Sequence, residues 1–352
     1  MGDNALDLLR QLERNEFGFF QKVRHVSDLM TREVPTLTLD DNLETAIQLF
    51  KDTTASHAPV IDPEKKDVVG LVSDRDLLRH RPRYVGTLGE QEDDRRVMRT
   101  PVSFMMVRSP AHVSQNGSLR DSLSLLLDHH LDCLVVYDDP TQVEGLLTRD
   151  DFLNSVLLYQ RFCLRVGQLR RLRLVDLDKG LPIDEIFRRG AQTVRDVMTF
   201  PAPTVNCEQT VAEAMARMQE LKVRHLVVVD DQELATGVLS DRDVVKALPP
   251  PPRTGAAPAT NGKAFLGALF ASEKYDPALK ARVASIMSPK LFTVAPESLL
   301  VEAISTLTEK HIHCLPVKDR ERRLVGLLTV TDVLRVIRMV MKLGAAPASL
   351  AE

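Results

Sequence analysis

The most constraining feature of this 352-residue sequence is a pattern that occurs four times. Each copy begins at a methionine and reaches a glycine 40, 39, 39 and 39 residues later. The pairs are Met30 and Gly70, Met106 and Gly145, Met198 and Gly237, and Met287 and Gly326. A fixed period of this length indicates repeated supersecondary units that pack against one another. We therefore predict four repeats joined by connections.

Inside each repeat, apolar residues follow the period of an α-helix. They recur at i, i+3, i+4 and i+7, which places them on one buried face. Two short apolar segments follow, each typical of a buried strand. The stripes are Leu43, Ala46, Ile47 and Phe50; Leu119, Ser122, Leu123 and Leu126; Val211, Ala214, Met215 and Met218; and Leu300, Ala303, Ile304 and Leu307. The expected fold is α/β (α+β), built from four β-α-β-β-α units.

The second apolar strand of every repeat runs into a helix through the motif Gly-x-x-Ser/Thr-x-x-Asp. A hydroxyl at this junction stands beside free N–H donors and the positive end of a helix dipole, which favour a phosphate. An Asp one turn later accepts hydrogen bonds and suits the two hydroxyls of a ribose. The spacing is also that of a capping box, so a purely structural role stays open. The motif residues are Ser73 and Asp76, Thr148 and Asp151, Ser240 and Asp243, and Thr329 and Asp332.

With these four motifs in one β-β-α context, the chain resembles the cystathionine β-synthase (CBS) domain family. The resemblance covers about two thirds of the chain and implies two tandem pairs, or Bateman modules. Repeats 1 and 2, and repeats 3 and 4, would pair about pseudo-twofold axes. The modules would meet in a flat disc similar to the γ subunit of AMP-activated protein kinase. The family also implies that the motif Asp holds the ribose of an adenosyl ligand, beside whose phosphates the Ser or Thr lies.

The repeats and their connections divide the chain into seven segments. We expect a helical lead-in over 1–26, CBS repeats over 27–82, 103–160, 193–247 and 283–343, an inter-module connection over 161–192, and a Pro-rich insert and connection over 248–282. The charged segment from Arg79 to Val102 is predicted to be a loop. The basic run from Arg165 to Arg173 is interpreted as an exposed helix face or linker, with an RNA-binding footprint as the alternative.

Two further groups of residues extend the candidate site. Adenine would need an apolar slot and backbone hydrogen bonds from the segment after each methionine, near Thr36, Thr204 and Thr293, with His112 at the matching place in repeat 2. Phosphates need cations, and the resemblance places basic residues of the strand after the helix near them. These residues are His57, Arg224, His225 and His313. A solvated or core-edge role for each histidine stays open.

Charge is expected to make the four sites unequal. Arg224 in repeat 3 can clamp a phosphate with paired hydrogen bonds. Repeat 2 instead carries Asp132 and Asp150, whose charges repel phosphates. We therefore expect phosphate-bearing ligands to bind better than adenosine, repeat 3 to be occupied first and repeat 2 last. The alternative is that cations act across the pair, in which case Arg224 would serve the site of repeat 4.

Composition argues against several other classes. Lys and Arg number 46 against 49 Asp and Glu, so a net charge of -3 supplies no basic field for nucleic acid or anionic membrane. No apolar run reaches the length of a membrane span, and the four cysteines lack metal-site spacing. We expect a cytoplasmic chain that binds neither membrane nor nucleic acid.

The predicted function is a non-catalytic regulatory sensor. Ligands of the AMP, ADP or ATP type would bind between paired repeats and signal by conformational change to another protein, or through self-association. No Walker loop, HExxH or GxSxG motif is present, so we predict no enzyme activity, catalytic cofactor or metal. The alternatives are a ligand-independent interaction scaffold and a sensor of another adenosyl ligand such as S-adenosylmethionine.

Overall fold

The computed structural model of the chain describes residues 25–53, 55–82, 91–156, 193–247 and 276–343. The predicted lead-in before residue 25, the connection over 161–192 with its basic run, and residues 248–275 of the insert lie outside these ranges.

The α/β prediction is confirmed, and the expected order of elements is present in repeats 1 to 3 and, apart from the first strand, in repeat 4. Repeat 1 comprises β1 (Leu37–Thr38), α3 (Leu43–Thr53), β2 (His57–Ile61), β3 (Val68–Ser73) and α4 (Asp74–His80). Repeat 2 comprises β4 (Val107–Arg108), β5 (His112–Val113), α6 (Leu119–Asp128), β6 (Cys133–Val136), β7 (Gly145–Thr148) and helical residues 149–156. Repeat 3 comprises β8 (Thr204–Asn206), α9 (Val211–Leu221), β9 (His225–Val229), β10 (Ala235–Ser240) and α10 (Asp241–Ala247). Repeat 4 comprises α13 (Leu300–Glu309), β11 (Cys314–Lys318), β12 (Leu324–Thr329) and α14 (Val330–Leu343).

A small sheet in each repeat positions the motif. The strand after the helix pairs antiparallel with the strand that ends in the motif, and its first residue lies opposite the motif Ser or Thr. The opposed pairs are His57 and Ser73, Cys133 and Thr148, His225 and Ser240, and Cys314 and Thr329. The first strand of repeat 4 is reduced to one parallel bridge between Val294 and Val317.

The predicted helical stripes form the cores. All four stripe residues are buried in α6, α9 and α13. In α3, Leu43 and Ala46 are buried, whereas Ile47 and Phe50 are partly buried against the same cluster. The period of the apolar residues therefore identified the buried face of every one of these helices.

Repeats 1 and 2 pair with each other, as do repeats 3 and 4, and the anchor methionines hold each pair together. Bridges join Thr31 to Leu146 and Thr199 to Leu327, and β3 pairs with β4. A Cβ added to Gly70 would lie 2.3 Å from the Sδ atom of Met106. Met30, Met198 and Met287 pack in the same way on Gly145, Gly326 and Gly237. Each methionine thus contacts the glycine of the paired repeat, and the predicted pairing is confirmed.

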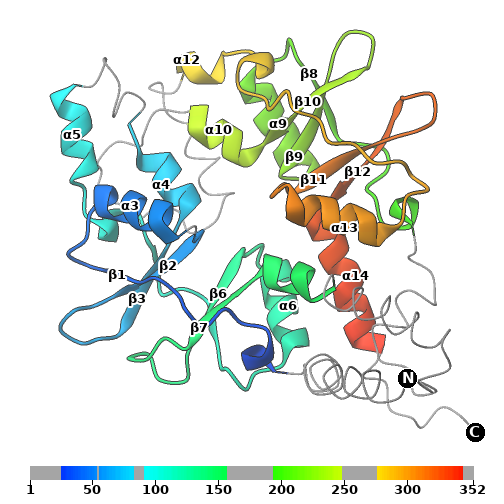
Figure 1. Cartoon of the computed structure of the whole chain (residues 1–352). Helices are drawn as coiled ribbons and strands as arrows, with labels where there is room; N and C mark the ends of the chain where they lie inside the picture. The colour runs from blue at the N-terminus through cyan, green and yellow to red at the C-terminus, as the bar shows by residue number, and fades with distance from the viewer. Residues whose placement is uncertain (1–24, 54, 83–90, 157–192, 248–275, 344–352) are drawn as a thin grey trace, which may run out of the picture.

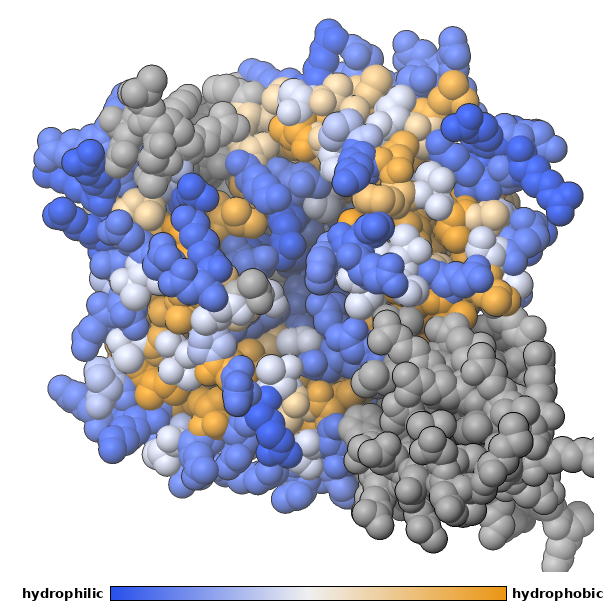
Figure 2. Space-filling model, in the orientation of Figure 1, coloured by the Kyte–Doolittle hydropathy of each residue, from blue (hydrophilic) through white to orange (hydrophobic). Residues whose placement is uncertain are grey.

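The two modules meet in the predicted disc. Helix α4 of repeat 1 packs on α10 of repeat 3, and α6 of repeat 2 packs on α14 of repeat 4. One apolar cluster includes Leu126 of repeat 2 and Leu334 of repeat 4. Figure 1 shows the four repeats around a common centre in the order 1, 2, 4, 3. The face in Figure 2 is hollowed at this centre and hydrophilic there.

The segment between Arg79 and Val102 differs from the prediction of a loop. Helix α4 continues to His80, and a further helix, α5, spans Glu92–Met98. Met98 is buried and belongs to the core cluster of repeat 1. The many charged residues of α5 are largely exposed, so its apolar contact is confined to one short face that sequence periodicity does not reveal.

Candidate functional site

The four Ser/Thr-x-x-Asp motifs share one geometry. In each, the Asp Oδ2 atom accepts hydrogen bonds from the hydroxyl and the backbone N–H three residues earlier. The hydroxyl distances are 2.6 Å for Ser73 and Asp76, 2.8 Å for Thr148 and Asp151, 2.6 Å for Ser240 and Asp243, and 2.6 Å for Thr329 and Asp332. The hydroxyl oxygen in turn accepts from the Asp backbone N–H. The capping role is therefore present in every copy, and it uses only one of the two carboxylate oxygens.

In repeats 2 and 4, that second oxygen, Oδ1, accepts a hydrogen bond from a threonine of the paired repeat. Thr31 donates to Oδ1 of Asp151 at 3.3 Å, and Thr199 donates to Oδ1 of Asp332 at 3.5 Å. Both threonines follow an anchor methionine and belong to the paired repeat. Burial raises the pKa of Asp151 and of Asp332, although the threonine hydrogen bonds act in the opposite direction.

A cavity of about 590 Å³ lies where repeats 1 and 2 meet, and we call it the repeat 1–2 cavity. Its lining combines residues from both repeats: Thr31, Glu33, Val34, Pro35, Thr53, Ala55, Ser56 and His57 from repeat 1, and Leu146, Thr148, Asp150 and Asp151 from repeat 2. One site therefore takes its methionine-following segment from one repeat and its motif from the other. This agrees with the expectation that ligands bind between paired repeats.

The matching place between the other two repeats is the repeat 3–4 junction. We define it by Thr199, Arg224, His225, Thr329 and Asp332. The bridge between Thr199 and Leu327 and the hydrogen bond between Thr199 and Asp332 repeat the contacts of the repeat 1–2 cavity. In both modules, therefore, the methionine-following segment of one repeat meets the motif of the paired repeat.

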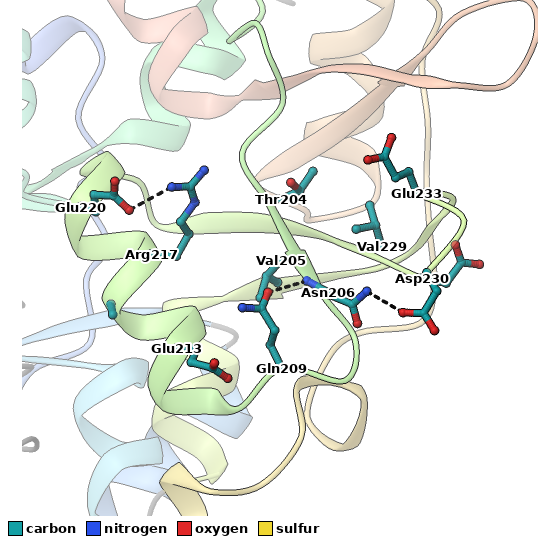
Figure 3. Close-up of a pocket in the computed structure, with 12 residues that line it drawn as sticks. Thr204, Val205, Asn206, Gln209, Glu213, Arg217, Glu220, Val229, Asp230 and Glu233 are labelled. Atoms are coloured by element: carbon teal, nitrogen blue, oxygen red, sulfur yellow. Dashed lines mark hydrogen bonds and ion pairs between the residues drawn. The ribbon is translucent and has the colours of Figure 1, made fainter.

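Of the three predicted adenine-side threonines, none lines the repeat 1–2 cavity. Thr36 and Thr293 are exposed, and Thr36 is not among the residues that line the repeat 1–2 cavity. Their neighbours Val34 and Pro35 do line it. Thr204 lines a separate hollow of about 850 Å³ on β8, α9 and the end of β9 (Figure 3).

This second hollow, although larger, has different chemistry. Glu213, Glu220 and Asp230 line it, and its Arg217 is paired with Glu220 at 2.9 Å (Figure 3). None of the four motifs contributes to it. The larger of the two hollows is therefore not the one that contains a motif.

Ion pairs connect three repeats at the centre of the disc. Arg224 of repeat 3 donates to Asp132 of repeat 2 at 2.8 Å, and Arg149 and Arg75 lie 3.4 and 3.3 Å from the same carboxylate. Burial alone would raise the pKa of Asp132, but the three guanidinium groups outweigh it and hold that pKa well below its usual range. Arg224 of repeat 3 and Asp132 of repeat 2 are therefore partners in one ion pair.

A second set of central ion pairs relates repeats 1 and 3. Arg242 contacts Asp74 at 2.7 Å, and Arg75 contacts Asp241 at 3.5 Å. These partners were not among the residues predicted from the sequence. The signal for them was the identical Ser-Asp-Arg-Asp stretch in the two repeats, which a pseudo-twofold relation turns into reciprocal ion pairs.

The central histidines are poor sources of positive charge. Burial lowers the pKa of His225 to about 4, with nearby His313 and Arg224 adding to the effect. The rings of His225 and His313 lie 6.4 Å apart. Burial also lowers the pKa of His57 and of His313. Because these shifts favour the neutral imidazoles, the histidines can act toward a phosphate as hydrogen-bond donors.

These features agree with a match to a known family. The sequence profile described as the CBS domain matches residues 26–83, 98–158, 194–250 and 283–339. The chain therefore belongs to the CBS domain family and contains four copies of the domain.

Individual relatives are distant. The uncharacterized protein MJ1404 of Methanocaldococcus jannaschii is 26% identical over 196 residues, which are 55% of this chain and 40% of that protein. The crystal structure of protein MJ1225 from the same organism, described as a proposed archaeal homologue of g-AMPK, matches with a TM-score of 0.58 at 16% identity and covers 89% of this chain and 99% of that one. The structure of CBSX2 in complex with AMP matches with a TM-score of 0.32 at 25% identity over 43% of this chain and 98% of that one. The match with MJ1225 shows the shared fold, and this chain spans less than half of MJ1404.

No helix in the described ranges is both long and apolar enough to cross a membrane.

Proposed function

We propose that this chain is a non-catalytic regulatory sensor that binds adenine nucleotides where paired CBS repeats meet. The observation that carries the proposal is a contact repeated in both modules, where a motif Asp meets the threonine after the anchor methionine of the paired repeat: Asp151 with Thr31 at 3.3 Å, and Asp332 with Thr199 at 3.5 Å. At the first of these places, the repeat 1–2 cavity of about 590 Å³ has the usual volume of a small-molecule site. The proposal includes a cytoplasmic location and a protein partner, which is another protein or a second copy of the chain.

Signalling follows from competition for Arg224. A phosphate near Thr329 and the N-terminus of α14 would attract this guanidinium, because charge-assisted hydrogen bonds to phosphate are strong. Arg224 is already paired with Asp132 of the other module. Nucleotide binding at the repeat 3–4 junction would therefore weaken a contact between modules and change their relative position.

The test is calorimetric titration of the whole chain with AMP, ADP and ATP. Asp332→Asn removes the carboxylate charge at the repeat 3–4 junction and should weaken AMP binding about tenfold or more, the usual loss for a hydrogen bond to a charged group. Asp121→Asn is the matched control, because Asp121 has the same spacing from Ser118 at the start of α6 but belongs to no Ser/Thr-x-x-Asp motif of a junction. Absence of binding by all three nucleotides would instead favour an interaction scaffold.

A further inference from the structure

We propose that the two modules divide adenosyl ligands by charge. The repeat 1–2 cavity takes a ligand without phosphate, either a neutral thioether nucleoside or a cationic sulfonium nucleoside, and the repeat 3–4 junction takes the phosphate-bearing nucleotide. This inference rests on the proposed function and adds the ligand class to each place.

The lining of the repeat 1–2 cavity is acidic. Glu33, Asp150 and Asp151 contribute carboxylates, and the residues that line it include no Lys or Arg. Its one imidazole, His57, has a pKa lowered by burial and carries little charge at neutral pH. A phosphate in this cavity would meet carboxylates and no partner of opposite charge.

The arginines next to the cavity in sequence are directed to other partners. Arg149 donates to the carbonyl of Leu131 at 2.8 Å and lies 3.4 Å from Asp132. Arg32 donates to the carbonyl of Ser27 at 2.9 Å. Asp150 also lies at the start of the helix over 149–156, where its charge offsets the positive helix dipole that would otherwise favour a phosphate.

The repeat 3–4 junction keeps the ribose-binding residues and changes the charges. Thr31, His57, Thr148 and Asp151 are matched by Thr199, His225, Thr329 and Asp332. In contrast, Glu33, Ser56 and Asp150 are matched by Pro201, Arg224 and Thr331. Each of these three exchanges adds one formal positive charge to the repeat 3–4 junction, where Arg224 is paired with Asp132 at 2.8 Å and with Asp241 at 3.5 Å, so a phosphate would compete with these carboxylates for it. The same sugar can therefore be bound at both places, with opposite preferences for what the sugar carries.

The exposure of the acidic residues sets the size of the effect. Glu33 and Asp150 are exposed, so their interaction with a ligand is screened by water and salt. We expect the repeat 1–2 cavity to bind 5′-methylthioadenosine or S-adenosylmethionine about fivefold or more tightly than AMP at low salt, and the difference to shrink as salt is added.

The experiment is calorimetric titration of the full chain with 5′-methylthioadenosine, S-adenosylmethionine and AMP. Binding that Asp151→Asn abolishes is assigned to the repeat 1–2 cavity. Asp150→Thr introduces the residue of the matching position and should raise AMP affinity in this cavity several-fold, lower that of S-adenosylmethionine and leave that of 5′-methylthioadenosine unchanged. Glu64→Gln is the matched control, because it removes one exposed negative charge in the turn between β2 and β3.

The outcomes separate this inference from the proposed function. If AMP and 5′-methylthioadenosine bind the cavity equally, or Asp150→Thr leaves their ratio unchanged, the division by charge is wrong while adenosyl binding stands. If none of the three probes binds the wild-type chain, the proposed function fails and this inference fails with it.

Discussion

Among single side chains, His225 makes the free energy of unfolding depend on pH. Its pKa of about 4 in the folded chain lies below the ordinary value of 6.5 because of burial. Between these values the unfolded chain binds a proton that the folded chain does not, so the free energy of unfolding decreases as pH falls from about 6.5 to about 4. Below that range the contribution stays constant.

Urea unfolding at pH 4.5 and 7.5 measures this dependence. His225→Asn should reduce the difference in unfolding free energy between the two pH values. His129→Asn, at the exposed end of α6, should retain the wild-type difference. An unchanged difference in His225→Asn would show that this histidine is protonated equally in the folded and unfolded chains.

At the scale of the elements, each anchor methionine packs on the glycine of the paired repeat, and the atoms nearest to that glycine differ from one pair to the next. A Cβ on Gly70 would meet only side-chain atoms of Met106, whereas a Cβ on Gly145 would lie 2.4 Å from the backbone oxygen of Thr31. Gly70→Ala and Gly145→Ala should each lower the unfolding free energy by about 1–3 kcal/mol through overpacking.

Double variants distinguish the two cases. Met106→Ala should recover part of the loss caused by Gly70→Ala, because it removes the clashing atoms. Met30→Ala should not rescue Gly145→Ala, because the Thr31 carbonyl remains. Additive losses in the Gly70 and Met106 cycle, measured by thermal or urea unfolding, would contradict the contact.

Local patterns predicted the elements better than they predicted the sites. The stripes of α6, α9 and α13 and the Ser/Thr-x-x-Asp caps depend on residues within a few positions of one another, so periodicity reveals them. The residue that a motif contacts in the paired repeat lies far away in the sequence, so periodicity does not reveal it. Asp151 meets Thr31 across 120 residues, and the pattern within one repeat does not reveal which methionine-following segment a motif will contact.

For the molecule as a whole, the ion pair between Asp132 and Arg224 joins the two modules. A phosphate at the repeat 3–4 junction would compete with Asp132 for this guanidinium. Asp132→Asn should raise AMP affinity at the repeat 3–4 junction about two- to fivefold, the equivalent of a partly exposed ion pair worth up to about 1 kcal/mol. Asp74→Asn is the matched control, because it breaks the pair with Arg242 and leaves Arg224 in place. Titration with AMP that shows equal affinity in both variants would contradict competition for Arg224.

This network could not be predicted from the sequence. Asp132 counted there as an unfavourable charge of repeat 2 and Arg224 as a favourable charge of repeat 3, although the two side chains are in contact. Their meeting depends on how α4, α10 and the two sheets assemble around the centre, which no periodicity within a repeat encodes.

The crystal structure of the chain with AMP tests the central claim most directly. The account predicts AMP at the repeat 3–4 junction, with the ribose at Asp332, the phosphate within hydrogen-bonding distance of Arg224 and the adenine beside the segment after Met198. AMP in the hollow lined by Glu213 and Glu220, with the junctions between paired repeats empty, would contradict it.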